Sequence, residues 1–275
     1  MAKQIITFIG GGNMARSLVG GLVADGFDPA RIRVADPDPQ QRHGLAQAFG
    51  IQSMESNLDA VRGADAVVLA VKPQVLRAVA EELAPALAGD KVLVVSIAAG
   101  VREPDLNRWL GGKAAVVRAM PNTPALVQSG ATGLYANSRV DTGQRSLAES
   151  LMRAVGLTCW LEDEKLLDAV TGVSGSGPAY FFLLMELMED AGARLGLSRE
   201  MARLLTIQTA FGAAKMALES EDDPQTLRRR VTSPGGTTER AIRVLEEGDL
   251  RDLVEQAIRS SAERADALGN ELGAQ

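Results

Sequence analysis

The stretch IITFIGGGNMARSLVGGLVA, residues 5–24, decides the fold. An apolar run, Gln4–Ile9, precedes three glycines, and an amphipathic segment from Ala15 to Ala24 follows them. This order predicts a buried strand, a tight turn and a helix. Gly10 permits the turn, Gly12 lets the backbone come close to a ligand, and a small residue at the start of the helix lets it pack closely on the strand.

The spacing of Gly10, Gly12 and Ala15 is the G-x-G-x-x-A form of the fingerprint with which a strand, turn and helix bind the pyrophosphate of a dinucleotide. A helix N-terminus adds free N–H groups and the positive end of its dipole, and both favour phosphate. A glycine triplet alone is weak evidence, but here the strand and the helix that the motif requires are both present. The residues predicted to bind the cofactor in this turn are Ile9, Gly10, Gly12, Asn13 and Met14.

Short apolar runs rich in β-branched residues alternate with longer amphipathic segments up to about residue 162. That alternation predicts a parallel sheet covered by helices on both faces, which is a doubly wound, Rossmann-type α/β fold. Several runs are apolar at consecutive positions, as Val92 to Val95 are, and this is typical of strands buried on both faces. The predicted strands are Gln4–Ile9, Arg31–Ala35, Ala66–Val71, Val92–Ile97, Ala115–Ala119 and Thr132–Ala136.

Beyond residue 162 the β-branched runs stop, and apolar residues recur with a period of 3.6. The sequence therefore predicts two domains, a dinucleotide-binding domain over residues 1–162 and an all-helical domain over residues 163–275. The helix expected over Ala179–Leu195 is apolar on more of its surface than one chain needs, with Phe181 and Met185 outside its main stripe. We therefore expect an obligate oligomer with this helix in its interface.

The composition excludes several classes of protein. The 275 residues carry a net charge of -6 without a basic cluster, so neither nucleic acid nor an anionic membrane is an expected partner. No run of about 18 apolar residues is uninterrupted, and no membrane span is expected. Cys159 is the only cysteine and no Cys/His cluster has metal-ligand spacing, which indicates a metal-free site and a reducing compartment, the cytoplasm.

Asp36 follows the second predicted strand, where an acidic residue hydrogen-bonds the adenosine ribose of a dinucleotide. Taken alone, this carboxylate favours NAD over NADP because it repels a 2′-phosphate. The alternative is that Asp36, in the run Asp36–Pro39, only caps the next helix and leaves Arg42 for a phosphate. The sequence does not decide between these interpretations.

Later strand ends supply further candidates, because ligands of open α/β sheets bind outside the carboxyl ends of the strands. Two segments, Ala70–Gln74 and Met120–Pro124, follow predicted strands directly. The alternative is that their prolines only end strands and begin helices. The cofactor residues expected along this edge are Asn57, Ala70, Val71, Lys72, Pro73, Ala98, Pro121 and Asn122.

Two glycine-rich turns in the helical region lead into predicted helices, Val173–Ala179, which contains Ser176, and Val231–Thr238. In the second turn, consecutive amides and hydroxyls could surround a carboxylate, and the helix dipole would assist them. We therefore expect an anion site without a basic side chain, formed by Ser233, Gly235, Gly236 and Thr237. The alternative is an ordinary helix N-cap, for which Ser and Thr are common, although one cap does not require two glycines and three hydroxyls.

The run Val231–Thr238, continued by Glu239, Arg240 and Ala241, resembles the most distinctive segment of the pyrroline-5-carboxylate reductase family. Other motifs similar to that family's follow in the family's order, so the resemblance covers nearly the whole chain; they are Gly10–Ala15, Ala70–Gln74, Met120–Ala125 and Gly175–Ala179. The resemblance implies a Rossmann domain followed by a helical dimerisation domain. It also implies that the long helices of two subunits interleave and that dimers assemble further, in many members into decamers.

The resemblance further implies hydride transfer from NADPH, with NADH as an alternative donor, to the C=N bond of 1-pyrroline-5-carboxylate, which gives L-proline. Asp36 departs from NADPH-preferring members, which tend to lack a carboxylate there, and leaves the cofactor preference open. Thr238 is the expected catalytic residue, because its hydroxyl could hydrogen-bond the ring nitrogen and later the proline amine. The substrate-binding candidates are Ser176, Glu221, Ser233, Gly235, Gly236, Thr237 and Thr238.

The chemistry of the reaction and of the residues bears on the expected roles of Thr238 and Glu221. A protonated imine already carries the charge that attracts hydride, so the reaction needs no strong acid and positioning supplies most of the rate. Glu221 is a weaker candidate than Thr238, because its acidic neighbours are typical of a solvated loop.

Two other functions fit the same fold class. A β-hydroxyacid dehydrogenase or a related imine reductase also pairs a Rossmann domain with helices. Chemistry on an alcohol needs a general base, typically a lysine on the first long helix of the second domain, and Ala179–Leu195 has none. A non-catalytic nucleotide sensor would keep the fold without the reaction. The apparently intact substrate turn argues against a sensor.

Overall fold

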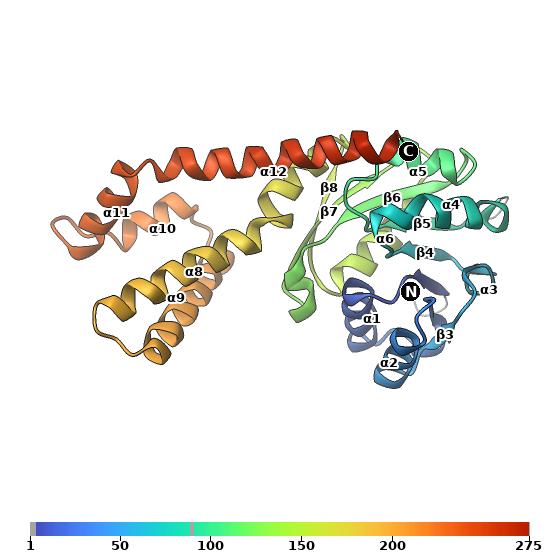
Figure 1. Ribbon diagram of the computed structural model, residues 1–275, viewed down its shortest axis with the longest axis horizontal. Coiled ribbons are helices and arrows are strands. Elements are labelled where there is room, and N and C mark those ends of the chain that lie inside the picture. Colours follow the sequence, from blue (N-terminus) through green and yellow to red (C-terminus); the bar gives the residue numbers. More distant parts are fainter. Residues whose placement is uncertain (1–3, 89–90, 275) are drawn as a thin grey trace. The chain divides into compact units, whose positions relative to one another are not determined.

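The computed structural model describes residues 4–88 and 91–274 (Figure 1). Within these residues the strands form one eight-stranded sheet in the order β3-β2-β1-β4-β5-β6-β7-β8. Neighbouring strands are parallel except β6 and β7, which are antiparallel. The strands are β1 (Ile6–Ile9), β2 (Ile32–Ala35), β3 (Gln52–Met54), β4 (Ala66–Leu69), β5 (Leu93–Ser96), β6 (Ala115–Met120), β7 (Gly130–Ala136) and β8 (Gly156–Leu161).

The doubly wound α/β class and the six predicted strands are confirmed, but three details differ. The sequence pattern did not reveal β3, which has only three residues, two of them exposed. It also did not reveal β8, an edge strand that is at most half-buried along its length. The expected parallel sheet is wrong at β6 and β7, because the short 3-10 segment η2 (Thr123–Val127) joins them in place of a crossover helix.

Helices cover both faces of the sheet. One face packs against α1 (Asn13–Ala24), α2 (Pro39–Phe49) and α6 (Thr142–Arg153). The other face packs against α3 (Asn57–Val61), α4 (Pro73–Leu87) and α5 (Glu103–Trp109). Burial on both faces accounts for the consecutive apolar residues of β4 and β5, all of which are buried. The carboxyl ends of the central parallel strands are left for a ligand.

The rest of the described chain is helical. The short helix α7 (Leu166–Val170) continues into a π-helical segment, η3 (Thr171–Gly175), which the amide of Ser176 closes with a 2.8 Å bond to the carbonyl of Thr171. The turn expected over Val173–Ala179 is therefore the end of this π-helical segment followed by the start of α8. The remaining helices are α8 (Gly177–Arg194), α9 (Arg199–Glu219), α10 (Pro224–Arg230), α11 (Thr237–Glu247) and α12 (Leu250–Gly273).

The chain divides into two compact units, one of residues 1–176 with 259–275 and one of residues 177–258. The last part of α12 belongs with the sheet, because Leu272 is buried in its core and Asp266 pairs with Arg102 at 2.6 Å. The predicted domain boundary at residue 162 marks the change from strands to helices and not the division into compact units. It therefore stays a prediction. Among the described helices, none is both long enough and apolar enough to cross a bilayer.

Candidate active site

The glycine turn between β1 and α1 is shaped to admit a ligand. Gly10 has a φ of +98°, and a Cβ there would lie 2.7 Å from the carbonyl oxygen of Ala70, so only glycine fits. Gly12 is the N-cap of α1, and the described residues supply neither a side-chain cap nor any atom within 4 Å of an added Cβ. The first amides of α1 therefore remain accessible, as binding of a pyrophosphate requires.

Asp36 braces this turn. Its Oδ2 accepts a hydrogen bond from the Gly11 amide at 2.7 Å, and its Oδ1 accepts one from the Asp38 amide at 2.8 Å. The N-cap of α2 is Asp38, whose side chain accepts a bond from Gln40, so the interpretation of Asp36 as the cap is wrong. Asp36 remains at the end of β2, where a dinucleotide would place its adenosine ribose.

Arg42 is held against the same segment. Its Nη1 donates to the carbonyls of Asp36 at 2.6 Å and Pro37 at 3.0 Å, and its Nη2 lies 3.7 Å from Glu55. Nη1 is thus committed to the backbone. The Nη2 side, next to an exposed carboxylate, remains available to a phosphate.

The structure brings the predicted cofactor residues to one edge of the sheet. Strands β3, β2, β1, β4, β5 and β6 are parallel neighbours, so their carboxyl ends meet there. At that edge Lys72 is exposed, and Asn57 donates to Glu82 at 3.0 Å. The residues that follow these strands are Gly10, Gly12, Asn13, Met14, Asp36, Asn57, Ala70, Val71, Lys72, Pro73, Ala98, Pro121 and Asn122. That each of them contacts the cofactor stays a prediction.

Asn122 has a role in the fold that the sequence did not reveal. Its side chain is buried, its Oδ1 accepts the Ala131 amide at 2.8 Å, and its Nδ2 donates to the carbonyl of Ser174 at 3.0 Å. The carboxamide thus ties the end of β6 to the start of β7 and to η3. A cofactor could use the second side-chain N–H or the second lone pair of Oδ1.

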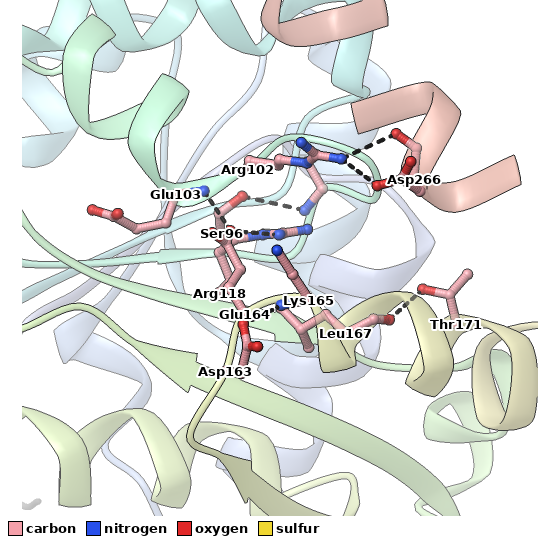
Figure 2. A network of polar contacts seen from close by, with 11 residues as sticks. Ser96, Arg102, Glu103, Arg118, Asp163, Glu164, Lys165, Leu167, Thr171 and Asp266 are labelled. Carbon is pink, nitrogen blue, oxygen red and sulfur yellow. Dashed lines mark hydrogen bonds and ion pairs between the residues drawn. The ribbon is translucent and has the colours of Figure 1, made fainter. Parts of the chain in front are cut away.

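A buried ion pair anchors the segment that leads to η3. Arg118 on β6 donates through Nη1 to Glu164 at 2.6 Å, and the same carboxylate oxygen accepts the Glu103 amide at 2.5 Å (Figure 2). Only 9% of the Arg118 side chain is exposed, so removal of Glu164 would leave a buried charge without its partner. The pair fixes the point at which the chain enters α7.

A polar hollow of about 410 Å³ lies beside this ion pair and is lined by Arg102, Asp168 and Tyr135 among others. Burial raises the pKa of the Asp168 carboxyl, although Arg118 partly offsets the effect. Burial and the charge of Glu164 likewise raise the pKa of Tyr135. The Asp168 carboxyl is therefore harder to ionise than one in water.

The turn before α11 has the backbone of a ligand loop. Gly235 has a φ of +71°, which favours glycine, and a Cβ on Gly236 would lie 2.6 Å from the Ser233 hydroxyl. The N-cap of α11 is Gly236, so the interpretation of the serine and threonine hydroxyls as the helix cap is wrong. Thr237 and Thr238 are the first two residues of the helix.

Two of the three amides expected to surround a carboxylate already have partners. The Gly235 amide donates to Oε2 of Glu239 at 2.8 Å, and the Gly236 amide donates to the carbonyl of Ser233 at 3.0 Å. The first contact shows this turn holding a carboxylate with a backbone N–H. Another carboxylate could use the Gly235 amide only by displacing Glu239.

Basic side chains lie next to this turn, contrary to the expectation of an anion site without them. Arg240 and Arg243 line a hollow of about 470 Å³ together with Gly235, Gly236 and Glu239. Spacings of three and four residues place such side chains on one face of a helix. That spacing was the sequence signal that could have identified both arginines.

Glu221 lies in the loop between α9 and α10, and its side chain is exposed. Its neighbours have structural partners. Asp222 pairs with Arg230, and Asp223 caps α10 by accepting the Thr226 amide at 2.7 Å, which lowers the pKa of Asp223. The structure gives Glu221 the setting of a solvated loop residue, and its role in substrate binding stays a prediction.

The chain resembles known proteins in both of its sequence regions. Residues 164–268 match the family model for pyrroline-5-carboxylate reductase dimerisation, and residues 5–100 match one described as NADP oxidoreductase, coenzyme F420-dependent. The pyrroline-5-carboxylate reductase of Pseudomonas aeruginosa is 55% identical over 273 residues, covering 99% of this chain and 100% of the relative. That of Pasteurella multocida is 42% identical over 273 residues, or 98% of each chain.

Solved structures agree. A pyrroline-5-carboxylate reductase from Coxiella burnetii superposes with a TM-score of 0.94 at 50% identity, over 96% of this chain and 98% of that one. The Plasmodium falciparum pyrroline carboxylate reductase, solved with NADP bound, gives a TM-score of 0.86 at 30% identity, over 98% of this chain and 99% of that one. The resemblance noted from the motifs is thus confirmed, and the chain belongs to the pyrroline-5-carboxylate reductase family.

Proposed function

We propose that the protein is a pyrroline-5-carboxylate reductase, which transfers hydride from NADPH, or from NADH as an alternative donor, to the C=N bond of 1-pyrroline-5-carboxylate. The product is L-proline, so the reaction is the last step of proline biosynthesis. The observation that carries this proposal is the Gly235 amide, which holds the carboxylate of Glu239 directly before a helix that begins with two threonines. A cyclic imino acid presents the same carboxylate, with its ring nitrogen nearby.

The residues at the sheet edge fit a dinucleotide. The uncapped start of α1 and the open space at Gly12 match the needs of a pyrophosphate, and Asp36 directly follows β2, where the ribose would lie. The Plasmodium falciparum relative carries NADP, which supports NADPH as the donor. When bound, the reduced nicotinamide supplies the hydride.

The proposed substrate-binding residues are those of the turn Ser233–Thr238, and Ser176 and Glu221 are further candidates. The amides of Gly235 and Thr237 bind the substrate carboxylate, and Glu239 moves aside. The Thr238 hydroxyl hydrogen-bonds the ring nitrogen. As hydride adds to the imine carbon, the electron pair of the C=N π bond goes to the protonated nitrogen, which becomes the secondary amine of proline. Thr238 then accepts a hydrogen bond from that amine, and no other acid is required.

The exposed apolar surface of α8 indicates that the protein assembles into an oligomer. The side chains of Phe181 and Phe182 on α8 are each 63% exposed in the single chain, and Leu183, Leu184 and Leu187 are each at least half exposed. A patch of this kind marks an interface. We infer a homodimer in which α8 interleaves with its copy, assembling further into a decamer, in the cytoplasm. A stable monomer in sedimentation at micromolar concentration would contradict this assembly.

The decisive test of the activity is the loss of reduced-nicotinamide absorbance when 1-pyrroline-5-carboxylate is added to the protein with NADPH, and separately with NADH. We expect turnover with at least one donor and L-proline as the product. A folded protein that binds both cofactors but consumes neither would contradict the proposal and favour a nucleotide sensor. Oxidation of a panel of β-hydroxyacids at a comparable rate would favour a β-hydroxyacid dehydrogenase instead.

A further inference from the structure

The hydroxyl oxygens of Ser176 and Ser261 lie 2.8 Å apart, within hydrogen-bond distance. Ser176 follows η3 directly, and Ser261 lies on the part of α12 that belongs to the same compact unit. Both side chains are partly buried, whereas the adjacent Ser260 is exposed in the single chain. This contact joins two segments that are 85 residues apart in the sequence.

The backbone around Ser176 is held independently of this contact. The Ser176 amide donates to the carbonyl of Thr171 at 2.8 Å, and Asn122 donates to the carbonyl of Ser174 at 3.0 Å. A Cβ at Gly175 would lie 2.9 Å from the terminal methyl of Met120, which would have to shift to make room for it. These contacts do not fix the χ1 torsion of Ser176, which has three staggered energy minima.

We propose that Ser261 is a positioning residue that sets the Ser176 hydroxyl for the substrate. This inference rests on the proposed function, in which Ser176 contacts the imino acid. A hydroxyl has one proton to donate and two lone pairs to accept with, so the Ser261 contact occupies one of these and selects one rotamer. The Ser176 hydroxyl then directs its remaining hydrogen-bonding capacity one way before the substrate binds. Binding therefore does not have to restrict the χ1 torsion of Ser176.

The consequence is kinetic. Without Ser261, the Ser176 hydroxyl is distributed over its rotamers and loses a partner, which weakens its contact with the substrate about three- to tenfold. The loss appears in KM for 1-pyrroline-5-carboxylate, or in kcat/KM if the contact tightens in the transition state. The KM for NADPH does not change, because Ser261 acts only through Ser176.

The test uses Ser261→Ala, Ser176→Ala and the double variant, with Ser260→Ala as the matched control on the same helix. We expect Ser261→Ala to raise KM for the imino acid about three- to tenfold and Ser260→Ala to leave it unchanged. In the Ser176→Ala background, Ser261→Ala should add nothing, because its target hydroxyl is already gone. Ser261→Thr, which keeps a hydroxyl, should restore most of the wild-type KM.

The outcomes separate the inference from the proposed function. If the wild-type protein does not reduce 1-pyrroline-5-carboxylate, the proposed function fails. If it does, but Ser261→Ala behaves like Ser260→Ala, only the positioning role is overturned. Additive losses in the double variant, or an equal rise in KM for NADPH, would show that Ser261 stabilises the fold in general and would also overturn that role. Thermal unfolding of all variants identifies any that are misfolded, and Ser261→Thr then carries the test.

Discussion

The carboxylate of Asp36 lies 2.7 Å from the amide nitrogen of Gly11, so the residue at the end of β2 holds the middle glycine of the turn after β1. The sequence raised Asp36 as either a ribose ligand or a helix cap. The structure shows a third role, which is compatible with the first. A charged group beside the adenosine ribose still opposes a 2′-phosphate.

Replacement of Asp36 by serine should therefore shift the cofactor preference. We expect kcat/KM for NADH to fall relative to that for NADPH, changing their ratio by about tenfold, the factor that corresponds to roughly 1.4 kcal/mol. Asp38→Asn removes the same charge two residues away and keeps an N-cap for α2, so it should leave the ratio unchanged. Steady-state kinetics with both donors checks this, and an unchanged ratio in Asp36→Ser would remove Asp36 from cofactor selection.

Thr238→Ala should lower turnover by roughly one to two orders of magnitude, the scale of a lost transition-state hydrogen bond. Thr238→Ser keeps the hydroxyl and should retain turnover within a few-fold of the wild type. Measurement of kcat at saturating imino acid and NADPH distinguishes the two. Undiminished turnover in Thr238→Ala would exclude the residue from the mechanism.

Gly235→Ala should disturb the substrate turn, because an L-residue at a φ of +71° costs about 1–2 kcal/mol. We expect a higher KM for the imino acid and a thermal midpoint lower by a few degrees. Gly44→Ala in the interior of α2 is the control, since its Cβ would meet only Arg16 at 3.7 Å and its φ is not in the left-handed region. That variant should be more stable by roughly 0.5–1 kcal/mol.

Asp168→Asn should change how stability depends on pH. Because burial raises the folded-state pKa of Asp168, the folded protein binds this proton more tightly than the unfolded chain does. The contribution of Asp168 to stability is therefore greatest below the unfolded pKa of about 4, and it falls as the pH rises from there through the raised folded pKa. The asparagine variant lacks this decline and should have a higher thermal midpoint than the wild type at neutral pH.

Asp163→Asn is the matched control for Asp168→Asn. It removes a carboxylate from the same hollow and keeps an acceptor for the Lys165 amide, which donates to Asp163 at 3.0 Å. Its midpoint should follow the wild-type pH profile. Equal gains in both variants would mean that the net charge of the hollow, and not the burial of Asp168, governs stability there.

The parts of the fold that were predictable from sequence are those with a strong local pattern. Buried strands such as β4 and β5 consist of consecutive apolar residues, apart from Ser96 at the end of β5, and the glycine turn has a fixed spacing. The short exposed strand β3 and the half-buried edge strand β8 lack such a pattern. The antiparallel β7 was not predictable either, because its direction depends on the length of the connection and not on its own residues.

The candidate site was predictable to the extent that each motif lies in one segment. The strand-end residues and the turn Ser233–Thr238 are of this kind. The contacts between distant segments were not predictable, as with Asn122 and Ser174 or Arg118 and Glu164, which are 46 residues apart. Only the fold brings such pairs together, and the local periodicity of the sequence does not indicate them.

The return of α12 to the sheet means that the nucleotide-binding unit is not encoded by one uninterrupted stretch. Residues 259–275 complete it, with Leu272 filling part of its core and the carbonyl of Gly273 accepting a bond from Arg108. A fragment cut at residue 162 would lack this final piece and would expose the apolar surface that it covers. During synthesis, the first unit therefore cannot complete its core until residues 259–275 have been added to the chain.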